Sequence, residues 1–250
     1  MLDFLVLGTA MKGSFMIQLT PRLAAAALLV PPAVSMADIG TDHAYLPIAL
    51  IQSGKIKHAI ASDIHEGPAE RAKEHIGKNG LTAAVRVRIA PGLLGLAPGE
   101  AEGAVIAGMG GLMIRNILEE GAAIAKTMQW FVLQPQNHGR ELRLWLAGHG
   151  YTIEKECLAR EDRMIYQLLF VRHGEMAPLT GVQWETGNPR LREKDPLFPS
   201  FLEGLIRKRD FTIQGVAKDT DNPVNKEKRR QAVEEKQELE ELLWKLKPGI

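Results

Sequence analysis

The chain has 250 residues, of which 45% are hydrophobic and 24% are charged, and its formal net charge is +1. This composition is typical of a soluble globular protein that can bury a core without a disulfide or a metal staple. The charge lacks the strong basic excess of many nucleic-acid binders, and the histidines and Cys157 do not have zinc-site spacing. Because Cys157 is the only cysteine, an internal disulfide is excluded, which fits a reducing compartment.

The amino-terminal residues 1–18 are expected to form an extension before the first domain. The segment Met1–Ala10 is apolar but lacks the basic region and cleavage flank of a signal peptide. The apolar stretch Leu19–Val34 is interrupted by Arg22 and by prolines, so it is too short to span a bilayer. We therefore expect a cytoplasmic protein without a membrane segment.

The first helix is predicted to begin at Thr20, which can cap it, with Pro21 at the first helical position. It is expected to end at Pro31-Pro32. Short apolar runs that predict strands follow at Val34–Ile39, His58–Ser62, Val85–Ile89, Ala104–Ala107 and Phe131–Leu133. Between them lie predicted helices near Ala44–Gln52, Pro68–Lys78, Leu112–Glu119 and Arg140–Ala147.

This alternation of strands and helices predicts an α/β fold with a mostly parallel, Rossmann-like sheet covered on both faces. Two later strands, Thr152–Cys157 and Ile165–Val171, are too close together for a helical crossover, so they are expected to form an antiparallel pair at the sheet edge. Seven strands that end in a hairpin are typical of a class I methyltransferase rather than a dehydrogenase. We assign this domain to residues 19–174.

Residues 175–250 are predicted to form a separate helical domain. Prolines and glycines between Pro178 and Pro199 indicate a linker, and two helices are expected at Phe198–Val216 and Asn225–Leu246, joined by Lys218–Pro223. An apolar stripe along the second helix, opposite Lys and Glu, predicts an antiparallel, coiled-coil-like hairpin. Its charges are typical of a solvated surface, with a partner-binding arm as the alternative.

The first strand of the sheet leads into an acidic loop, Asp38–His43. Gly40 allows a tight turn and close approach of a ligand, but the further glycines of a dinucleotide site are absent. A pyrophosphate disfavours nearby carboxylates, whereas Asp38 and Asp42 suit a ligand with positive charge. S-adenosylmethionine carries an ammonium and a sulfonium, so this methyl donor is favoured over a nicotinamide. Asp63, after the second strand, can accept both ribose hydroxyls, or it can cap the next helix.

At this point the sequence resembles a known family. The segments Ala37–Pro47, Ile106–Gly111 and Leu133–Pro135 are similar to the bacterial tRNA (adenine-22, N1)-methyltransferase family. Leu19–Leu23 resembles the opening motif of that family, and Glu66-Gly67-Pro68 matches the turn after its second strand. The similarity covers residues 19–174 and continues loosely through the carboxyl-terminal helices.

The resemblance implies transfer of a methyl group from S-adenosylmethionine to N1 of an adenine in tRNA. The residues that are then expected to contact the cofactor are Asp38, Gly40, Thr41, Asp42, His43, Asp63, Ile64, Gly92, Leu93, Ala107 and Gly108. The family commonly has a Gly-Asp-Gly-Leu-like turn after the third strand, whose acid can touch the adenine amino group. The corresponding turn here, Ala90–Leu93, lacks that acid and has Pro91 in its place.

The fourth strand leads into a glycine-rich loop, Ala107–Gly111, which lets a flat ring approach the backbone or simply serves as a tight turn. N1 of adenine has an in-plane lone pair and no proton to lose, so positioning can supply much of the catalysis. The residues expected at the reaction centre are Asp42, Gly108, Met109, Gly110 and Gln134. Asp42 is a candidate to stabilise the cationic product, and Gln134 and Gln136 are candidates for base contacts, although Pro135 alone can explain a rigid loop start.

Binding of tRNA requires cations and unpairing of the target base. The candidate phosphate contacts are Arg22, Arg115, Arg140, Arg143, Arg160, Arg163, the run Arg207-Lys208-Arg209 and the segment Lys226–Arg230. Three alternatives stay open: a methyltransferase for another RNA base or a small molecule, a nicotinamide-dependent dehydrogenase, and a non-catalytic S-adenosylmethionine-binding module. The oligomeric state is not determined by the sequence.

Overall fold

The computed structural model describes residues 17–216 and 222–246. Its centre is a seven-stranded sheet in the order β3-β2-β1-β4-β5-β7-β6. The strands are β1 (Ala33–Ile39), β2 (Ile56–Asp63), β3 (Val85–Ile89), β4 (Gly103–Met109), β5 (Trp130–Pro135), β6 (Tyr151–Glu161) and β7 (Met164–His173). Strand β7 runs antiparallel to β5 and β6, and the other pairings are parallel. The predicted parallel sheet with an edge hairpin is confirmed.

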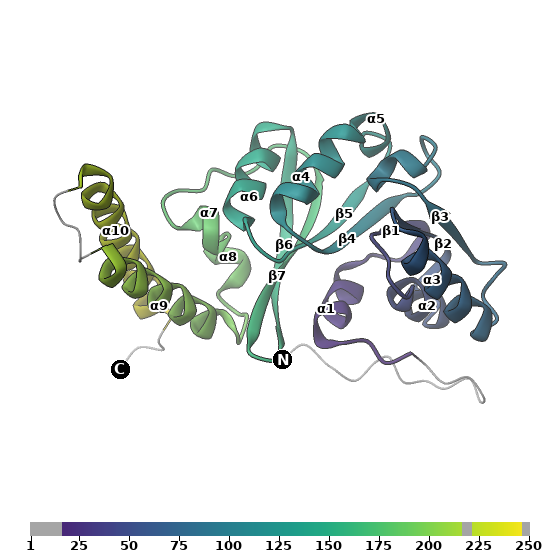
Figure 1. Ribbon diagram of the computed structural model, residues 1–250, viewed down its shortest axis with the longest axis horizontal. Helices are drawn as coiled ribbons and strands as arrows, with labels where there is room; N and C mark the ends of the chain where they lie inside the picture. Colours follow the sequence, from purple (N-terminus) through teal and green to yellow (C-terminus); the bar gives the residue numbers. More distant parts are fainter. Residues whose placement is uncertain (1–16, 217–221, 247–250) are drawn as a thin grey trace.

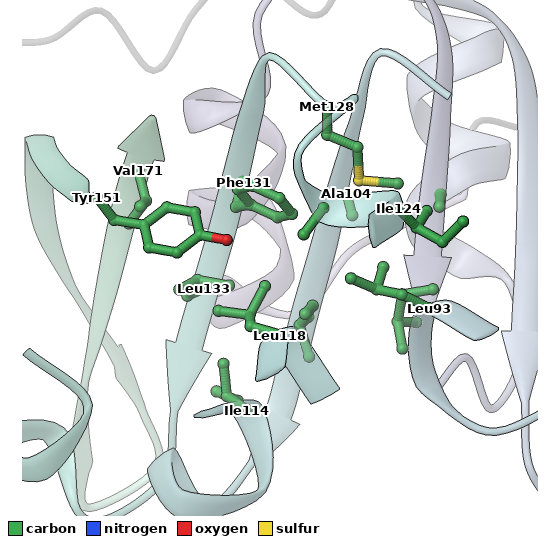
Figure 2. Packing of buried hydrophobic residues seen from close by; sticks show 14 of the residues in the cluster. Leu93, Ala104, Ile114, Leu118, Ile124, Met128, Phe131, Leu133, Tyr151 and Val171 are labelled. Atoms are coloured by element: carbon green, nitrogen blue, oxygen red, sulfur yellow. The ribbon is translucent and has the colours of Figure 1, made fainter. Parts of the chain in front are cut away.

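Helices cover both faces of this sheet (Figure 1). One face carries α1 (Pro21–Leu29), α2 (Tyr45–Gln52) and α3 (Glu66–Lys78), and the other carries α4 (Gly111–Glu120), α5 (Ala122–Ala125) and α6 (Gly139–Gly148). A short 3-10 turn, η1 (Gly92–Gly95), follows β3. Figure 2 shows Phe131 and Leu133 of β5 packed with Ile114 and Leu118 of α4 in the core on that second face.

Helix α1 begins as the sequence predicts. The side chain of Thr20 accepts a hydrogen bond from the backbone N–H of Leu23, and Pro21 occupies the first turn. The backbone N–H of Arg22 donates to the carboxylate of Glu161 at 3.2 Å. Because this contact joins the free end of α1 to the end of β6, it fixes the helix against the sheet edge.

The segment that was predicted to be a linker is ordered, and this is a correction. It contains α7 (Gln183–Thr186) and α8 (Pro189–Arg192), and the side chains of Thr186 and Arg192 are fully buried. The carboxylate of Glu156 accepts hydrogen bonds from Arg143 at 2.9 Å and from Arg192 at 2.6 Å, which attaches α8 to β6 and α6. Proline and glycine punctuation does not reveal such an ion-pair network.

Two long helices, α9 (Phe198–Val216) and α10 (Pro223–Lys245), form the expected antiparallel hairpin beside the sheet (Figure 1). An apolar cluster that includes Leu202, Leu205 and Leu239 joins it to Leu158 of β6. In the described part of the chain, no helix is long and apolar enough to cross a membrane. The predictions for residues 1–16 and 217–221 lie outside the described residues.

Candidate active site

The predicted site residues gather where the parallel strands end. Strands β1 and β4 are neighbours, and the chain crosses to opposite sides of the sheet after them, which is the position where open α/β sheets bind ligands. The loops after β1, β2, β4 and β5 therefore share one edge of the sheet. The ends of β1 and β2, with the loops that follow, carry the predicted acids, and the ends of β4 and β5 carry glycines and amides.

Asp38 is the most unusual acid at this edge. It is only 8% exposed, and burial raises its pKa to about 6. A hydrogen bond with Thr41 opposes this rise, while the charge of Asp63 adds to it. A buried carboxylate without a cationic partner from the protein costs stability and is a common mark of a ligand site. Asp38 is thus well suited to a ligand with a positive charge.

Gly40 shapes the turn that follows Asp38. Its φ of 78° is in the left-handed region, and its N–H donates to the carbonyl of Ser62 at 2.7 Å. A side chain at Gly40 would collide with the terminal methyl group of Met109. The next residue, Thr41, is buried, and its hydroxyl accepts from the N–H of Ala44 at 3.1 Å. This turn therefore brings β1 and the loop after β4 into direct contact.

Asp42 and His43 point toward helix α3 rather than along the sheet edge. The carboxylate of Asp42 accepts from Nε of Arg71 at 2.9 Å and lies 3.2 Å from Nε2 of His43. The ring of His43 stacks on Tyr45 and His75 with centroids 5.0 Å away in each case. Because the charge of Asp42 already has partners, this acid is less available to a ligand than Asp38.

The loops after β2 and β3 provide the next part of the edge. One carboxylate oxygen of Asp63 accepts from the N–H of His65 at 2.8 Å. The N-cap of α3 is His65 and no side chain caps this helix, so the alternative that Asp63 is the helix cap is wrong. Ile64 is 59% exposed beside Asp63. Gly92 has a φ of 52°, whereas the side chain of Leu93 is buried in the core. Leu93 can therefore contact a ligand only through its backbone.

The glycines of the loop after β4 have different roles. Gly108 has a φ of 80° and forms a bulge between Ala107 and Met109 in the pairing with β5. Side chains at Gly110 or Gly111 would collide with Asn137 or with the backbone of His138. These two glycines therefore serve packing, whereas Gly108 lies beside the side chains of Arg22 and Gln136.

Gln134 holds Gly108 in place. Its side chain is fully buried, and its oxygen accepts from the N–H of Gly108 at 2.9 Å and from Nη1 of Arg22 at 3.0 Å. Its amide nitrogen donates to the carbonyl of Pro135 at 3.1 Å. Gln134 is thus bonded on both sides within the protein, which disfavours the predicted base contact. The exposed Gln136 lies next to Gly108 as well and is the better candidate for that contact.

A cleft of about 800 Å³ begins at this point and extends to the helical hairpin. On the sheet side it is lined by Pro135, Gln136 and Tyr166, and on the hairpin side by Phe201 and Leu205. The sequence gives no sign of this cleft, because Phe201 on one wall is 35 positions from Tyr166 and 65 positions from Gln136 on the other. The sequence predicts Arg22 only as a candidate phosphate contact, and it does not predict Tyr166 as a site residue.

The structure also separates the cationic candidates. Arg143 is completely buried in the network around Glu156, so its predicted contact with a phosphate is wrong. Arg209 pairs with Glu185 and Glu235. Among the residues that the structure describes, no group of His, Cys, Asp or Glu is arranged to hold a metal ion.

Comparison with protein families finds a match over residues 19–169 to the family described as "Methyltransferase domain". The tRNA (adenine(22)-N(1))-methyltransferase of Bacillus subtilis (strain 168) is 32% identical over 232 residues, which cover 91% of this chain and 98% of that protein. A putative tRNA methyltransferase of Mycoplasma pneumoniae is 36% identical over 54% of this chain and 61% of its own length.

Solved structures show the same similarity across both parts of the chain. The crystal structure of the B. subtilis M1A22 tRNA methyltransferase superposes with a TM-score of 0.80 at 30% identity, covering 91% of this chain and 99% of that chain. The TrmK protein of M. capricolum, solved in complex with the cofactor product S-adenosyl-homocysteine, superposes with a TM-score of 0.79 at 27% identity, covering 90% and 99%.

Proposed function

The chain belongs to the tRNA (adenine(22)-N(1))-methyltransferase family, and from this premise we propose that it transfers a methyl group from S-adenosylmethionine to N1 of adenine 22 in tRNA. The observation that carries the proposal is the contrast between two adjacent loops at the sheet edge. The end of β1 buries an acid, Asp38, without a cationic partner among the described residues, and the end of β4 offers a neutral, glycine-lined surface.

The acidic loop fits S-adenosylmethionine. The buried carboxylate of Asp38 would hold a positively charged group of the cofactor, because a charge-assisted hydrogen bond compensates the cost of burying the acid. Asp63 would accept the ribose hydroxyls through the carboxylate oxygen that does not bond to His65. When bound, the cofactor supplies an electrophilic methyl group. The other residues predicted to contact the cofactor are Gly40, Thr41, Ile64, Gly92, Leu93, Ala107 and Gly108, whereas Asp42 and His43 point toward α3.

The other loop fits a nucleobase that needs no general base. N1 of adenine carries a lone pair in the ring plane, so the protein has to orient the ring and exclude competing water. Gly108 has no side chain between its backbone and Arg22 or Gln136, and Gln136 can bond to the polar edge of a ring there. Gln134 accepts a hydrogen bond from Gly108, and Arg22 donates one to Gln134, so these two side chains hold the backbone at Gly108 in place. Because N1 lies on the Watson–Crick edge, the target base must be unpaired before it enters.

The tRNA is proposed to contact cations of the hairpin, in keeping with a division into residues 19–174 for methyl transfer and 175–250 for RNA binding. Lys226, Lys228 and Arg229 of α10 are exposed and take part in no ion pair within the described residues. Arg230 beside them pairs with Glu227 and Glu234. Arg207 and Lys208 of α9 are also exposed and take part in no ion pair within the described residues, so phosphate binding is proposed for both groups, with Lys226, Lys228 and Arg229 as the group on α10.

The direct test uses tRNA transcribed in vitro, labelled S-adenosylmethionine and nucleoside analysis of the product. We expect 1-methyladenosine from a transcript with adenine at position 22 and none from the same transcript with guanine there. Methylation of both transcripts would mean that another base is the target. Cofactor binding without any methylated nucleoside would support a non-catalytic module instead.

The contribution of the hairpin is tested with the triple variant K226Q/K228Q/R229Q. If all three cations contact phosphates, the variant binds tRNA more weakly, and the slope of log K against log salt concentration becomes shallower by up to about 3. This value assumes that each phosphate contact contributes about 0.9 to the slope, as it does for duplex DNA. The matched control is K73Q/K78Q on α3, where both lysines are exposed and paired with glutamates. Equal salt slopes for the triple variant and the wild type would contradict the proposed docking surface.

A further inference from the structure

Tyr166 stands at the start of β7, where the cleft between the sheet and the hairpin begins. Its ring is half-buried and lines the cleft, and the guanidinium carbon of Arg22 lies 5.8 Å from the ring centroid. We propose that Tyr166, supported by Arg22, is the platform on which the acceptor base stacks after it leaves the RNA helix. This inference rests on the proposed function, because it assigns a specific contact to the same acceptor base.

A chain of contacts connects Tyr166 to Gly108 at the end of β4 through the side chain of Arg22. Nη1 of Arg22 lies 3.5 Å from the point where a Cβ atom of Gly108 would be, and it donates to Gln134 at 3.0 Å. The same guanidinium group then reaches the ring of Tyr166. Gln136 lies beside Gly108 and also lines the cleft. Tyr166 is thus the aromatic residue that this set of contacts connects to the expected place of the base.

Arg22 is held firmly enough to support a stacking platform. The backbone N–H of Arg22 donates to Glu161 at 3.2 Å, and its Nε lies 3.8 Å from the same carboxylate. Gln134 fixes the other end of the guanidinium group. A planar cation that is restrained on two sides keeps the neighbouring ring in place at little further entropic cost.

Several of the charged side chains that line the cleft have partners within the protein. Glu185 pairs with Arg209, and Glu235 pairs with both Arg209 and Arg140. Glu238 accepts from the N–H of Val182 at 3.0 Å. Phe201 and Leu205 contribute apolar wall, and Glu141, Lys208 and Glu234 line the cleft as well, so the aromatic surface borders a rim of mixed charge. Stacking on an aromatic side chain is a general way to hold an unpaired base.

The experiment compares Tyr166→Leu with Tyr166→Phe and uses a tRNA that carries either adenine or the fluorescent analogue 2-aminopurine at the target position. For Y166L we expect kcat/KM to fall about tenfold or more, while cofactor affinity stays at the wild-type value. Y166F keeps the ring and should restore kcat/KM to within about twofold. With 2-aminopurine, the complex of Y166L should be brighter than that of the wild type, since stacking on Tyr166 would quench the emission.

The control is Val34→Ala, which shortens an apolar side chain that is 52% exposed near the start of β1, at the end of the strand away from the site, and does not line the cleft. It should leave both the rate and the emission unchanged. A wild-type enzyme that methylates the transcript, together with a Y166L variant of equal kcat/KM and equal emission, would overturn the stacking role alone. A wild-type enzyme that methylates no adenine would overturn the proposed function and this inference with it.

A second measurement uses only the wild-type chain, so it does not depend on the folding of Y166L. Transcripts with 8-azidoadenine at the target position are irradiated in the complex, and the attached peptide is identified by mass spectrometry. Attachment to the peptide that contains Tyr166 is expected. Attachment confined to peptides outside the cleft and the adjoining loops would contradict the proposal.

Discussion

Two acidic side chains are buried in the described part of the chain, and the protein surrounds them differently. Glu156 of β6 lies between Arg143 and Arg192, and its second oxygen lies 3.3 Å from the N–H of Asn188. Asp38 of β1 has only the hydroxyl of Thr41 and the nearby charge of Asp63. Burial alone would raise the pKa of either group. The two arginines outweigh burial at Glu156 and hold its pKa below the ordinary value, whereas the pKa of Asp38 rises to about 6.

This difference separates a structural charge from a functional one. A buried carboxylate that is fully paired stabilises one arrangement of the chain, and its partners leave no capacity for a ligand. A buried carboxylate without a cation is stable only at a cost, which a cationic ligand can remove. If this interpretation is right, changes at Glu156 should affect stability, and changes at Asp38 should affect cofactor binding.

The largest effect is expected from Glu156→Gln. The substitution keeps the shape of the side chain but leaves two buried guanidinium groups without an anion, which should lower the free energy of unfolding by about 3–5 kcal/mol. Urea denaturation measures this loss. The matched control is Glu154→Gln on the same strand, where the pair with Arg172 is about half exposed and should contribute less than about 1 kcal/mol. Equal losses of unfolding free energy in the two variants would show that the buried ion pairs of Glu156 contribute no more stability than an exposed pair.

The second effect is expected from Asp38→Asn. A charge-assisted hydrogen bond contributes about 1.5–3 kcal/mol, so affinity for S-adenosylmethionine should fall roughly 10- to 100-fold. The free energy of unfolding at neutral pH should stay equal or rise, because the variant no longer buries an unpaired charge. Calorimetric titration and urea denaturation measure the two quantities. Unchanged affinity, or a loss of stability as large as that of Glu156→Gln, would break the contrast between the two acids.

The pH dependence sharpens the same contrast. In the folded chain Asp38 binds its proton more tightly than in the unfolded chain, so its protonation stabilises the fold at low pH, and this contribution is lost as the pH rises through about 6. Cofactor binding has the opposite sign, because it needs the ionised acid. We expect affinity to fall by up to about tenfold per pH unit below 6 in the wild type, and to stay nearly flat over that range in Asp38→Asn. A flat wild-type profile between pH 5 and 8 would contradict a role of Asp38 as an anion.

The sequence predicts one of these two acids and not the other, for a physical reason. Asp38 ends a run of apolar residues and precedes Gly40, and both signals are local. The hydrophobic periods likewise predict the strands and long helices to within a few residues. Glu156 pairs with residues that are 13 and 36 positions away, in an edge strand whose alternation looks like that of any half-exposed strand. Its burial arises only when α8 packs on the sheet.

The same limit applies to the acceptor side of the site. The glycines at 108–111 are visible as a motif, but the bonds of Gln134 to Gly108 and Arg22 join three separate elements. Residue types alone therefore suggest Gln134 as a base contact, whereas its burial shows that it supports the loop. Tyr166 has no local signal, since its place in the cleft depends on how the hairpin lies beside the sheet.

The smallest effect is expected from Arg71→Gln, which tests an intermediate case. Asp42 is paired like Glu156, but its side chain is 58% exposed, and that of Arg71 is 47% exposed. Solvent screens such a pair, so the free energy of unfolding should change by less than about 1 kcal/mol. Removing Arg71 also frees the carboxylate of Asp42 in the same loop, and affinity for S-adenosylmethionine should then rise slightly or stay equal. Calorimetric titration of S-adenosylmethionine into Arg71→Gln and into Asp38→Asn compares the affinities of the two variants. A loss of affinity as large as that of Asp38→Asn would show that the pair of Asp42 and Arg71, rather than the buried acid, organises the cofactor loop.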